Sequence, residues 1–299
     1  ELDTSSEQEN TLWRQTLKAD DKELGIAKPR FDDAHSAKLA GEAALYSGAG
    51  RVYIGLLQTG TLSHDAGLMV RHLADADTLN ARRCKEATTV CGCGGGQAIA
   101  QWLPALLQHC PRLVMDADAL NAVAASTQLQ GMLRQRAADG MVTVLTPHPL
   151  EAARLLGCHS AEIQQDRMAA ANALASKYQS MIVLKGSGSI CVLPHILPVA
   201  HQNQGTSAVI NFSGNARLAT PGTGDVLAGC MGAYWAQAHA KSPHNTPGSA
   251  WETAWHACCS AVHAHGRIAD IWNEHEPVMQ GALSAQRLAQ GLRRPNPAI

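Results

Sequence analysis

The stretch ATTVCGCGGGQAIAQWLPALL covers residues 87–107 and decides the fold class of this 299-residue chain. It reads as a short strand that ends near Val90, a turn with four glycines between Gly92 and Gly96, and an apolar helical pattern over residues 99–107. A strand, a glycine turn and a helix in this order are typical of a phosphate or substrate loop in a parallel sheet. The sequence therefore predicts an α/β fold with a mostly parallel central sheet.

Strand and helix patterns alternate on both sides of this stretch. Upstream, residues 36–46 have helical spacing and residues 51–54 resemble a strand, whereas residues 58–86 predict surface loops with a short strand over 68–70. Further elements are predicted in this order: strand 113–115, helix 119–125, strand 141–145, helices 150–156 and 161–178, a hairpin of strands 181–184 and 190–193, and helices 226–238, 251–272 and 283–292.

The composition of the chain excludes several classes of function. Its formal net charge is -1 and no block of Lys or Arg stands out, so we expect no binding to nucleic acid or to an anionic membrane. Apolar runs stay well short of the ~20 residues that cross a bilayer, and the start of the sequence has no signal pattern, so we expect a cytoplasmic protein. The nine cysteines form no C-x-x-C pair and no set with zinc spacing, which indicates reduced interior thiols and no protein metal site. We expect one domain over residues 31–299, after a short helix and linker over residues 1–30.

The turn Thr220-Pro221-Gly222-Thr223-Gly224-Asp225 leads directly into the predicted helix 226–238. The unpaired N–H groups at a helix start point outward with partial positive charge, and glycines let a phosphate approach them closely. The turn therefore predicts an anion site, with Asp225 as the candidate catalytic residue. An aspartate at this place is also a good helix N-cap, and the tetrapeptide alone does not separate the two roles.

Two other predicted strands end in polar residues. Thr146-Pro147-His148-Pro149 places a histidine between two prolines, which either fixes the ring in a pocket or makes a rigid turn at a helix start. Lys185 precedes a glycine-rich turn, where it either meets a phosphate or is simply exposed. The chain has no G-x-x-x-x-G-K-[ST] loop, no complete G-x-G-x-x-G and no G-x-S-x-G elbow, which excludes P-loop proteins, ordinary dehydrogenases and serine hydrolases of that type.

Five ordered motifs resemble those of the ADP/ATP-dependent NAD(P)H-hydrate dehydratases, a family of the ribokinase-like superfamily. The motifs are Asp116–Asn121, Thr146–Pro149, Leu184–Gly186, Gly214–Ala216 and Gly222–Gly229. The resemblance covers residues 36–292 and implies a ribokinase-like three-layer α/β/α sandwich. It also implies conversion of (6S)-NAD(P)HX, the hydrated nicotinamide cofactor, to NAD(P)H. In that chemistry ADP or ATP phosphorylates the hydroxyl left by hydration, and phosphate is then eliminated.

The resemblance further implies roles for individual residues. Asp225 matches the catalytic aspartate, where a base would accept the hydroxyl proton. The implied nucleotide contacts are Lys185, Gly186, Ser187, Gly188, Ser189, Asn215, Gly222, Thr223 and Gly224. The implied contacts to the hydrated cofactor are Ser36, Gly94, His148 and Asp225. Mg²⁺ is expected to accompany the nucleotide, and the family also implies a homo-oligomer, a tetramer, and functional pairing with an NAD(P)HX epimerase.

The chain departs from the family pattern at three places. Leu150 and Pro221 stand where the family usually has glycine, and Pro221 removes an N–H next to the anion site. The family's first strand and its glycine-rich loop should lie between Arg30 and Ser36, so that segment is either deleted or missing from the sequence. Two rival functions share the glycine turn: a small-molecule kinase acting on a vitamin-precursor alcohol, and a nucleotide-sensing or scaffold protein without turnover.

Overall fold

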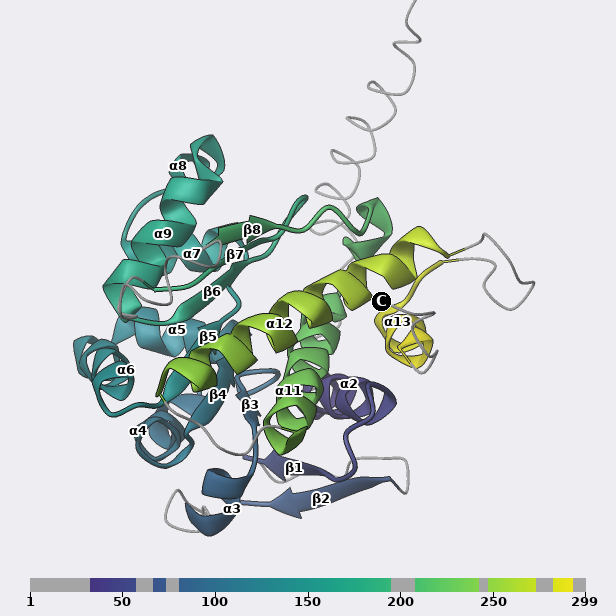
Figure 1. Ribbon diagram of the computed structural model, residues 1–299, viewed down its shortest axis with the longest axis horizontal. Helices are drawn as coiled ribbons and strands as arrows, with labels where there is room; N and C mark the ends of the chain where they lie inside the picture. The colour runs from purple at the N-terminus through teal and green to yellow at the C-terminus, as the bar shows by residue number, and fades with distance from the viewer. Residues whose placement is uncertain are drawn as a thin grey trace, which may run out of the picture.

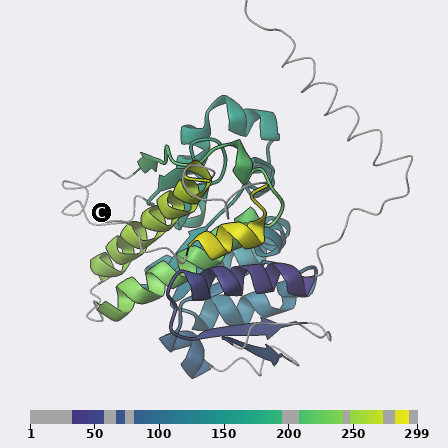
Figure 2. The ribbon, with the colours of Figure 1, turned by 90° about the vertical axis from the view of Figure 1, so that its right-hand side faces the viewer.

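The chain folds with helices on both faces of a central sheet (Figures 1 and 2). The computed structural model describes residues 33–57, 67–73, 81–194, 208–241, 247–272 and 282–292. The helix and linker predicted over residues 1–30 lie outside this part of the chain. No helix in the described ranges is long and apolar enough to cross a membrane. All nine cysteines are free in the structure, and six of them are buried.

The central sheet has six strands in the order β3-β4-β5-β6-β7-β8. The strands are β3 (Thr89–Cys91), β4 (Arg112–Met115), β5 (Val142–Leu145), β6 (Met181–Leu184), β7 (Ile190–Val192) and β8 (Ala208–Ile210). The first four run parallel, and the last two add antiparallel pairs, so the mostly parallel sheet is confirmed. β4, β5 and β6 are buried along their whole length, which accounts for their largely apolar sequences. The parallel strands end at one edge of the sheet, where ligands bind in such folds.

A layer of helices covers each face of this sheet. Successive strand side chains point to opposite layers: Leu113 and Met115 pack in one cluster, and Val114 packs in another. The first layer contains α4 (Ile99–His109), α5 (Ala117–Ala125), α6 (Thr127–Ala138), α7 (Pro149–Leu156), α8 (Ser160–Gln165) and α9 (Arg167–Tyr178). The second contains α11 (Thr223–Lys241) and α12 (Pro247–Asp270). The predicted three-layer sandwich is therefore confirmed (Figure 1).

The remaining elements surround α11 and one side of the sheet. They are α2 (Asp33–Tyr46), β1 (Val52–Leu56), β2 (Leu68–His72), α3 (Ala81–Glu86), the 3-10 helix η2 (Ala216–Leu218) and α13 (Ala285–Gly291). α2 and α13 pack with the start of α11 in a third apolar cluster that includes Leu39, Val226 and Leu288. β1 and β2 pair in parallel and form a separate two-stranded sheet.

The structure differs from the sequence predictions at several places, among them the helix α6, for which the sequence predicted no element. Residues 81–86 form a helix rather than a loop, and Cys84 anchors this helix in the core. The single helix predicted over residues 161–178 is two helices, because Asp166 ends α8 and accepts a hydrogen bond from the Ala169 N–H, at 2.8 Å, as the N-cap of α9. The helix predicted from Ser36 begins earlier, at Asp33, and the described residues before Ser36 contain no strand, as the departure from the family pattern led us to expect.

A glycine sets the distance between α2 and α11. A Cβ on Gly229 would overlap the Ala40 carbonyl group of α2. We therefore expect Gly229→Ala to lower the free energy of unfolding by about 1–3 kcal/mol, the usual cost of overpacking, in chemical denaturation.

Gly131→Ala is the matched control, because Gly131 lies in α6 with open space at its Cβ position. The better helix propensity of alanine should leave the stability of this control unchanged or raise it by up to about 1 kcal/mol. Equal effects of the two substitutions would contradict the packing described for α2 and α11.

Candidate active site

The glycine turn forms the start of α11 and packs against α2. Gly222 has φ +87°, and a Cβ there would lie only 2.8 Å from Leu39 Cδ1, so the turn requires glycine for its backbone and for its packing. The Thr223 hydroxyl donates its hydrogen to two backbone carbonyl oxygens. They belong to Leu218, at 2.8 Å, and to Thr220, at 2.9 Å. The Thr223 N–H also donates to the Thr220 carbonyl oxygen at 3.3 Å, and the first turn of α11 is thereby held in a fixed position.

Asp225 is the third residue of α11, so the alternative interpretation as the helix N-cap is wrong. Burial, followed by the charge of Asp116, raises the pKa of its carboxyl to about 6. Side-chain hydrogen bonds with Ser36 and Cys93, and the charge of Lys185, act in the opposite direction. At neutral pH Asp225 is therefore a carboxylate whose pKa suits a general base.

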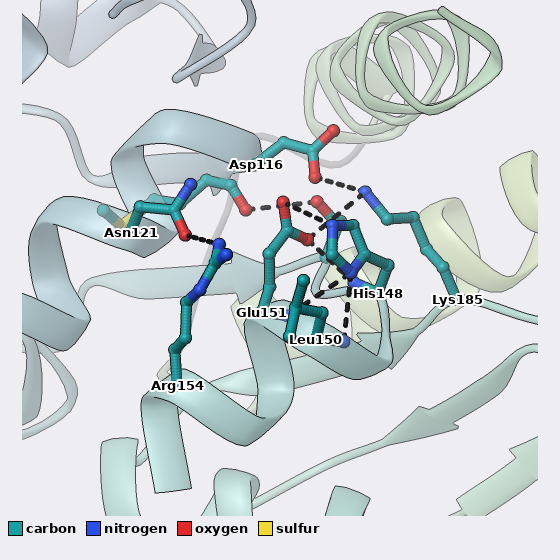
Figure 3. Close-up of polar contacts among 9 residues, drawn as sticks. Asp116, Asn121, His148, Leu150, Glu151, Arg154 and Lys185 are labelled. Atoms are coloured by element: carbon teal, nitrogen blue, oxygen red, sulfur yellow. Dashed lines mark hydrogen bonds and ion pairs between the residues drawn. The ribbon is translucent and has the colours of Figure 1, made fainter. Parts of the chain in front are cut away.

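A buried ion pair lies beside the turn (Figure 3). Lys185 follows β6, and its Nζ lies 2.5 Å from Oδ1 of Asp116, which follows β4. Asp116 is 1% exposed. A Cβ on Gly224 would lie 3.4 Å from Lys185 Nζ and 3.7 Å from Asp116 Oδ2, so the pair borders the predicted anion site. Burial alone would lower the pKa of Lys185, but the charges of Asp116 and Glu151 keep it above its ordinary value and the ammonium stays charged.

The glycine loop after β3 brings a thiol to the same place. Gly92 has φ +102°, and a Cβ there would overlap the backbone of Asp116. The Asp116 N–H donates a hydrogen bond to the Cys91 carbonyl oxygen at 3.0 Å and ties this loop to the end of β4. As a result, one side-chain atom from each of Cys93, Asp116 and Asp225 lies within 4.8 Å of the others. Burial and the charges of both aspartates raise the pKa of the Cys93 thiol, so it stays protonated and donates to Asp225.

His148 is the N-cap of α7, which confirms the predicted turn at a helix start. The ring Nδ1 of His148 accepts hydrogen bonds from the backbone N–H groups of Leu150 (3.1 Å) and Glu151 (3.3 Å). The backbone N–H of His148 donates to Glu151 Oε2 at 2.8 Å. Nδ1 therefore carries no hydrogen, and the neutral ring presents Nε2–H. Burial and the charge of Lys185 lower the pKa of His148, which favours this neutral form. Leu150, which replaces the family's glycine, is 47% exposed.

The loop over residues 185–189 is held in place by Arg167. The Arg167 guanidinium donates a hydrogen bond to the Ser187 carbonyl oxygen. Gly186 has φ +149°, and a Cβ there would lie 2.8 Å from Arg167 Nη2, so this contact also requires glycine. Gly186 and Ser187 are exposed, which leaves the outer side of the loop accessible to a ligand.

Asn215 and His265 link the glycine turn to α12. Asn215 Nδ2 donates a hydrogen bond to the Ala269 carbonyl oxygen at 2.8 Å, and its Oδ1 accepts one from the Arg217 N–H at 3.1 Å. His265 Nε2 lies 2.9 Å from the Thr223 carbonyl oxygen and carries the hydrogen, because a carbonyl oxygen only accepts. Burial lowers the pKa of His265 to about 4, so this ring is neutral at physiological pH. Both side chains therefore stabilise the position of the turn.

Sequence-predicted side chains from distant parts of the chain meet at this edge of the sheet. Ser36 and Lys185 both lie close enough to Asp225 to lower its pKa. Lys185 Nζ also lies 3.9 Å from Oε2 of Glu151, the carboxylate that pairs with His148 (Figure 3). Five side chains of this region were not predicted as site residues: Cys93, Asp116, Glu151, Arg167 and His265.

Comparison with known proteins finds relatives that have names from NAD(P)H-hydrate repair. A family model described as NAD(P)H-hydrate dehydratase matches residues 34–293. The ADP-dependent (S)-NAD(P)H-hydrate dehydratase of Neisseria meningitidis serogroup B is 34% identical over 252 residues, which cover 83% of this chain and 76% of that protein. The bifunctional NAD(P)H-hydrate repair enzyme Nnr of Escherichia coli K12 is 33% identical over 261 residues, which cover 85% of this chain and 44% of that protein. The chain thus spans less than half the length of the bifunctional relative.

Solved structures confirm the fold. The ADP/ATP-dependent NAD(P)H-hydrate dehydratase of Bacillus subtilis, co-crystallised with ATP and Mg²⁺, has a TM-score of 0.60 and 24% identity, with 87% of this chain and 83% of that chain covered. A ribokinase-like superfamily protein of Enterococcus faecalis has a TM-score of 0.62 and 21% identity, with 86% and 80% covered. Both structural similarities indicate a ribokinase-like fold. The match to the family model covers most of the sequence. The chain therefore belongs to the NAD(P)H-hydrate dehydratase family.

Proposed function

We propose that this chain catalyses the ADP- or ATP-dependent dehydration of (6S)-NAD(P)HX to NAD(P)H, within one domain over residues 31–299. The observation that carries the proposal is the Asp225 carboxylate in the first turn of α11, next to the ion pair of Asp116 and Lys185. A base beside an anion site is the arrangement that phosphorylation of a hydroxyl requires. The names of the Neisseria and Bacillus relatives support this substrate and these nucleotides.

The first step transfers a phosphoryl group to the hydrate hydroxyl. Asp225 accepts the hydroxyl proton as the oxygen attacks phosphorus. The N–H groups of Gly222 and Gly224 in the glycine turn and the Lys185 ammonium stabilise negative charge on the transferred group. The phosphorylated hydroxyl is a good leaving group, and elimination of phosphate restores the double bond of the ring.

We assign the ligand contacts as the family resemblance implies. The exposed backbone of Gly186 and Ser187 and the anion site at Gly224 support nucleotide binding there, and the half-exposed His148 ring, held by its contacts with Glu151, supports contact with the hydrated cofactor. The nucleotide contacts are Lys185, Gly186, Ser187, Gly188, Ser189, Asn215, Gly222, Thr223 and Gly224. The contacts to the hydrate are Ser36, Gly94, His148 and Asp225.

Mg²⁺ would enter with the nucleotide and neutralise its phosphates. The three converging side chains of Cys93, Asp116 and Asp225 offer one thiol and two carboxylates. Mg²⁺ prefers octahedral oxygen ligands and keeps several waters, and Asp116 is already paired with Lys185. This set does not fit a protein cage for Mg²⁺, so we assign the ion to the nucleotide phosphates and water.

We further propose that the chain is a cytoplasmic homo-oligomer, a tetramer, that acts together with an NAD(P)HX epimerase. The Escherichia coli relative is named a bifunctional repair enzyme, which supports a second repair activity beside this one. The tetramer follows from the family resemblance.

An assay with the purified chain tests the proposed function. The hydrate is incubated with ADP or ATP, and recovery of the reduced cofactor is followed by its near-ultraviolet absorbance. We expect recovery that depends on the nucleotide. Folded protein that binds nucleotide without any recovery would contradict the proposal and favour the nucleotide-sensing alternative, and phosphorylation of an alcohol from a substrate panel would favour the kinase.

The reaction rate should depend on the ionisation of Asp225. Its pKa is raised to about 6, and a general base acts only when it is ionised, so kcat/KM should fall as the pH drops below about 6 and level off above about pH 7. Well below the pKa the loss should be about tenfold per pH unit. A pH profile of kcat/KM at saturating nucleotide measures this decrease on the acidic side. A flat profile between about pH 5 and pH 8, with the protein folded throughout, would be inconsistent with Asp225 as the base.

A further inference from the structure

Dehydration of the hydrate, the proposed function on which this inference rests, removes two protons from neighbouring positions of one ring. The first leaves the hydroxyl on carbon 6 when its oxygen attacks phosphorus. The second leaves carbon 5: the C6–O bond breaks and its electron pair departs with phosphate, while the C5–H electron pair becomes the C5=C6 double bond and the proton passes to a base. A carboxylate that accepted the first proton is neutral and has to lose it before it accepts the second.

Two carboxylates border the anion site. An oxygen of Asp116 and an oxygen of Asp225 lie within 4.8 Å of each other. A base has to be about 2.6–3.2 Å from the atom whose proton it removes, so two bases at this separation can serve neighbouring atoms of one ring. Asp116 Oδ2 lies 3.7 Å from the position of a Cβ on Gly224, which places it beside the candidate anion site.

Lys185 pairs with only one of the two carboxylates, so their surroundings differ. Its Nζ lies 2.5 Å from Asp116 Oδ1 and supplies the counter-charge for Asp116, whereas Oδ2 points to the Gly224 side. In the described part of the chain no lysine lies at hydrogen-bond distance from Asp225, and burial together with the charge of Asp116 raises the pKa of Asp225 to about 6. Once Asp225 takes the first proton, the repulsion between the two carboxylates disappears, and Asp116 keeps its contact with the Lys185 ammonium.

The neighbouring polar groups are already engaged in other contacts. Glu151 Oε2 accepts the N–H of His148 at 2.8 Å, and burial raises the pKa of Glu151. The Cys93 thiol is protonated and donates to Asp225. His265 is fixed through Nε2 to a backbone carbonyl oxygen. Asp116 is therefore the carboxylate best placed, by its position, for a second proton transfer.

We propose that Asp116 is a second catalytic base, which accepts the proton from carbon 5 while phosphate leaves carbon 6. Asp225 serves the phosphorylation step, and Asp116 serves the elimination step. Both carboxylates release their protons to solvent before the next turnover.

Single-turnover experiments with Asp116→Asn separate the two steps. Asparagine keeps the shape of the side chain and an oxygen acceptor for Lys185, but it does not take up the proton. With excess enzyme, the hydrate and ATP, we expect ATP consumption and accumulation of the phosphorylated hydrate in mass spectra, with NADH recovery slowed on the order of 10²–10⁴-fold. Asp139→Asn is the matched control, the same change at an exposed aspartate after α6, and it should leave both steps unchanged.

Two results would overturn this assignment: recovery of NADH at the wild-type rate, or a variant that binds ATP and hydrate but consumes no ATP. A wild-type chain that neither consumes nucleotide nor recovers NADH would instead refute the proposed function itself. If Asp116→Asn does not fold, Asp116→Glu is tested with hydrate deuterated at carbon 5. A misplaced base makes C–H cleavage slower, so the isotope effect on NADH recovery should exceed that of wild type, and equal isotope effects would overturn the assignment.

Discussion

Asp225→Asn is expected to lower kcat on the order of 10²–10⁴-fold, the usual contribution of a general base. The substitution keeps the size of the side chain in the first turn of α11 but removes the group that accepts the hydroxyl proton. It also removes a negative charge next to the anion site, so nucleotide affinity should be retained or improved. The loss should therefore be confined to turnover.

Steady-state kinetics and nucleotide titration of the Asp225→Asn variant measure these two effects separately. Because Asp225 is the third residue of α11 and not its N-cap, the melting temperature should change little. A variant with wild-type kcat would remove Asp225 from the catalytic role. A variant that has lost nucleotide binding and turnover together would indicate a structural role instead.

Lys185→Met should reduce stability and nucleotide affinity together. Methionine fills the space of the lysine stem but leaves the Asp116 carboxylate buried without its counter-charge. Removing one partner of a buried ion pair costs about 3–5 kcal/mol, which chemical denaturation at neutral pH measures. Loss of a charged hydrogen bond to phosphate should also weaken nucleotide binding about ten- to hundredfold.

The double variant Lys185→Met/Asp116→Asn separates these two consequences. It no longer contains an uncompensated buried charge, so most of the lost stability should return, whereas nucleotide affinity should stay low. If the double variant is less stable than the Lys185→Met variant, the two side chains do not form the stabilising pair that the structure shows.

The layers of the fold could be predicted because they follow from local patterns. The buried parallel strands have short apolar sequences, and each is followed by polar or glycine residues and then a helix. The ends of helices were harder to predict, because they depend on single side chains. Asp166 divides α8 from α9 through one N-cap hydrogen bond. The helix over residues 81–86 has no apolar repeat of its own and is held by packing of Cys84.

The candidate site was predictable only where a residue ends a strand or starts a helix. Lys185 and His148 met that condition, and Glu151 could have been found from its position three residues after a helix cap. Cys93 looks like an ordinary interior thiol in the sequence, and its contact with Asp225 depends on the close approach of two loops. Arg167 lies at the start of a helix without any motif, and only the three-dimensional structure places it at the loop over residues 185–189.

The stoichiometry of nucleotide consumption tests the central claim most directly. Purified protein is given a limited amount of (6S)-NADHX with excess ADP or ATP, and phosphate release and NADH recovery are measured in the same sample. Phosphorylation followed by elimination predicts one phosphate released for each NADH recovered, with formation of both products slowed together on the order of 10²–10⁴-fold in Asp225→Asn. Recovery of NADH without consumption of nucleotide would contradict phosphoryl transfer at the glycine turn of α11.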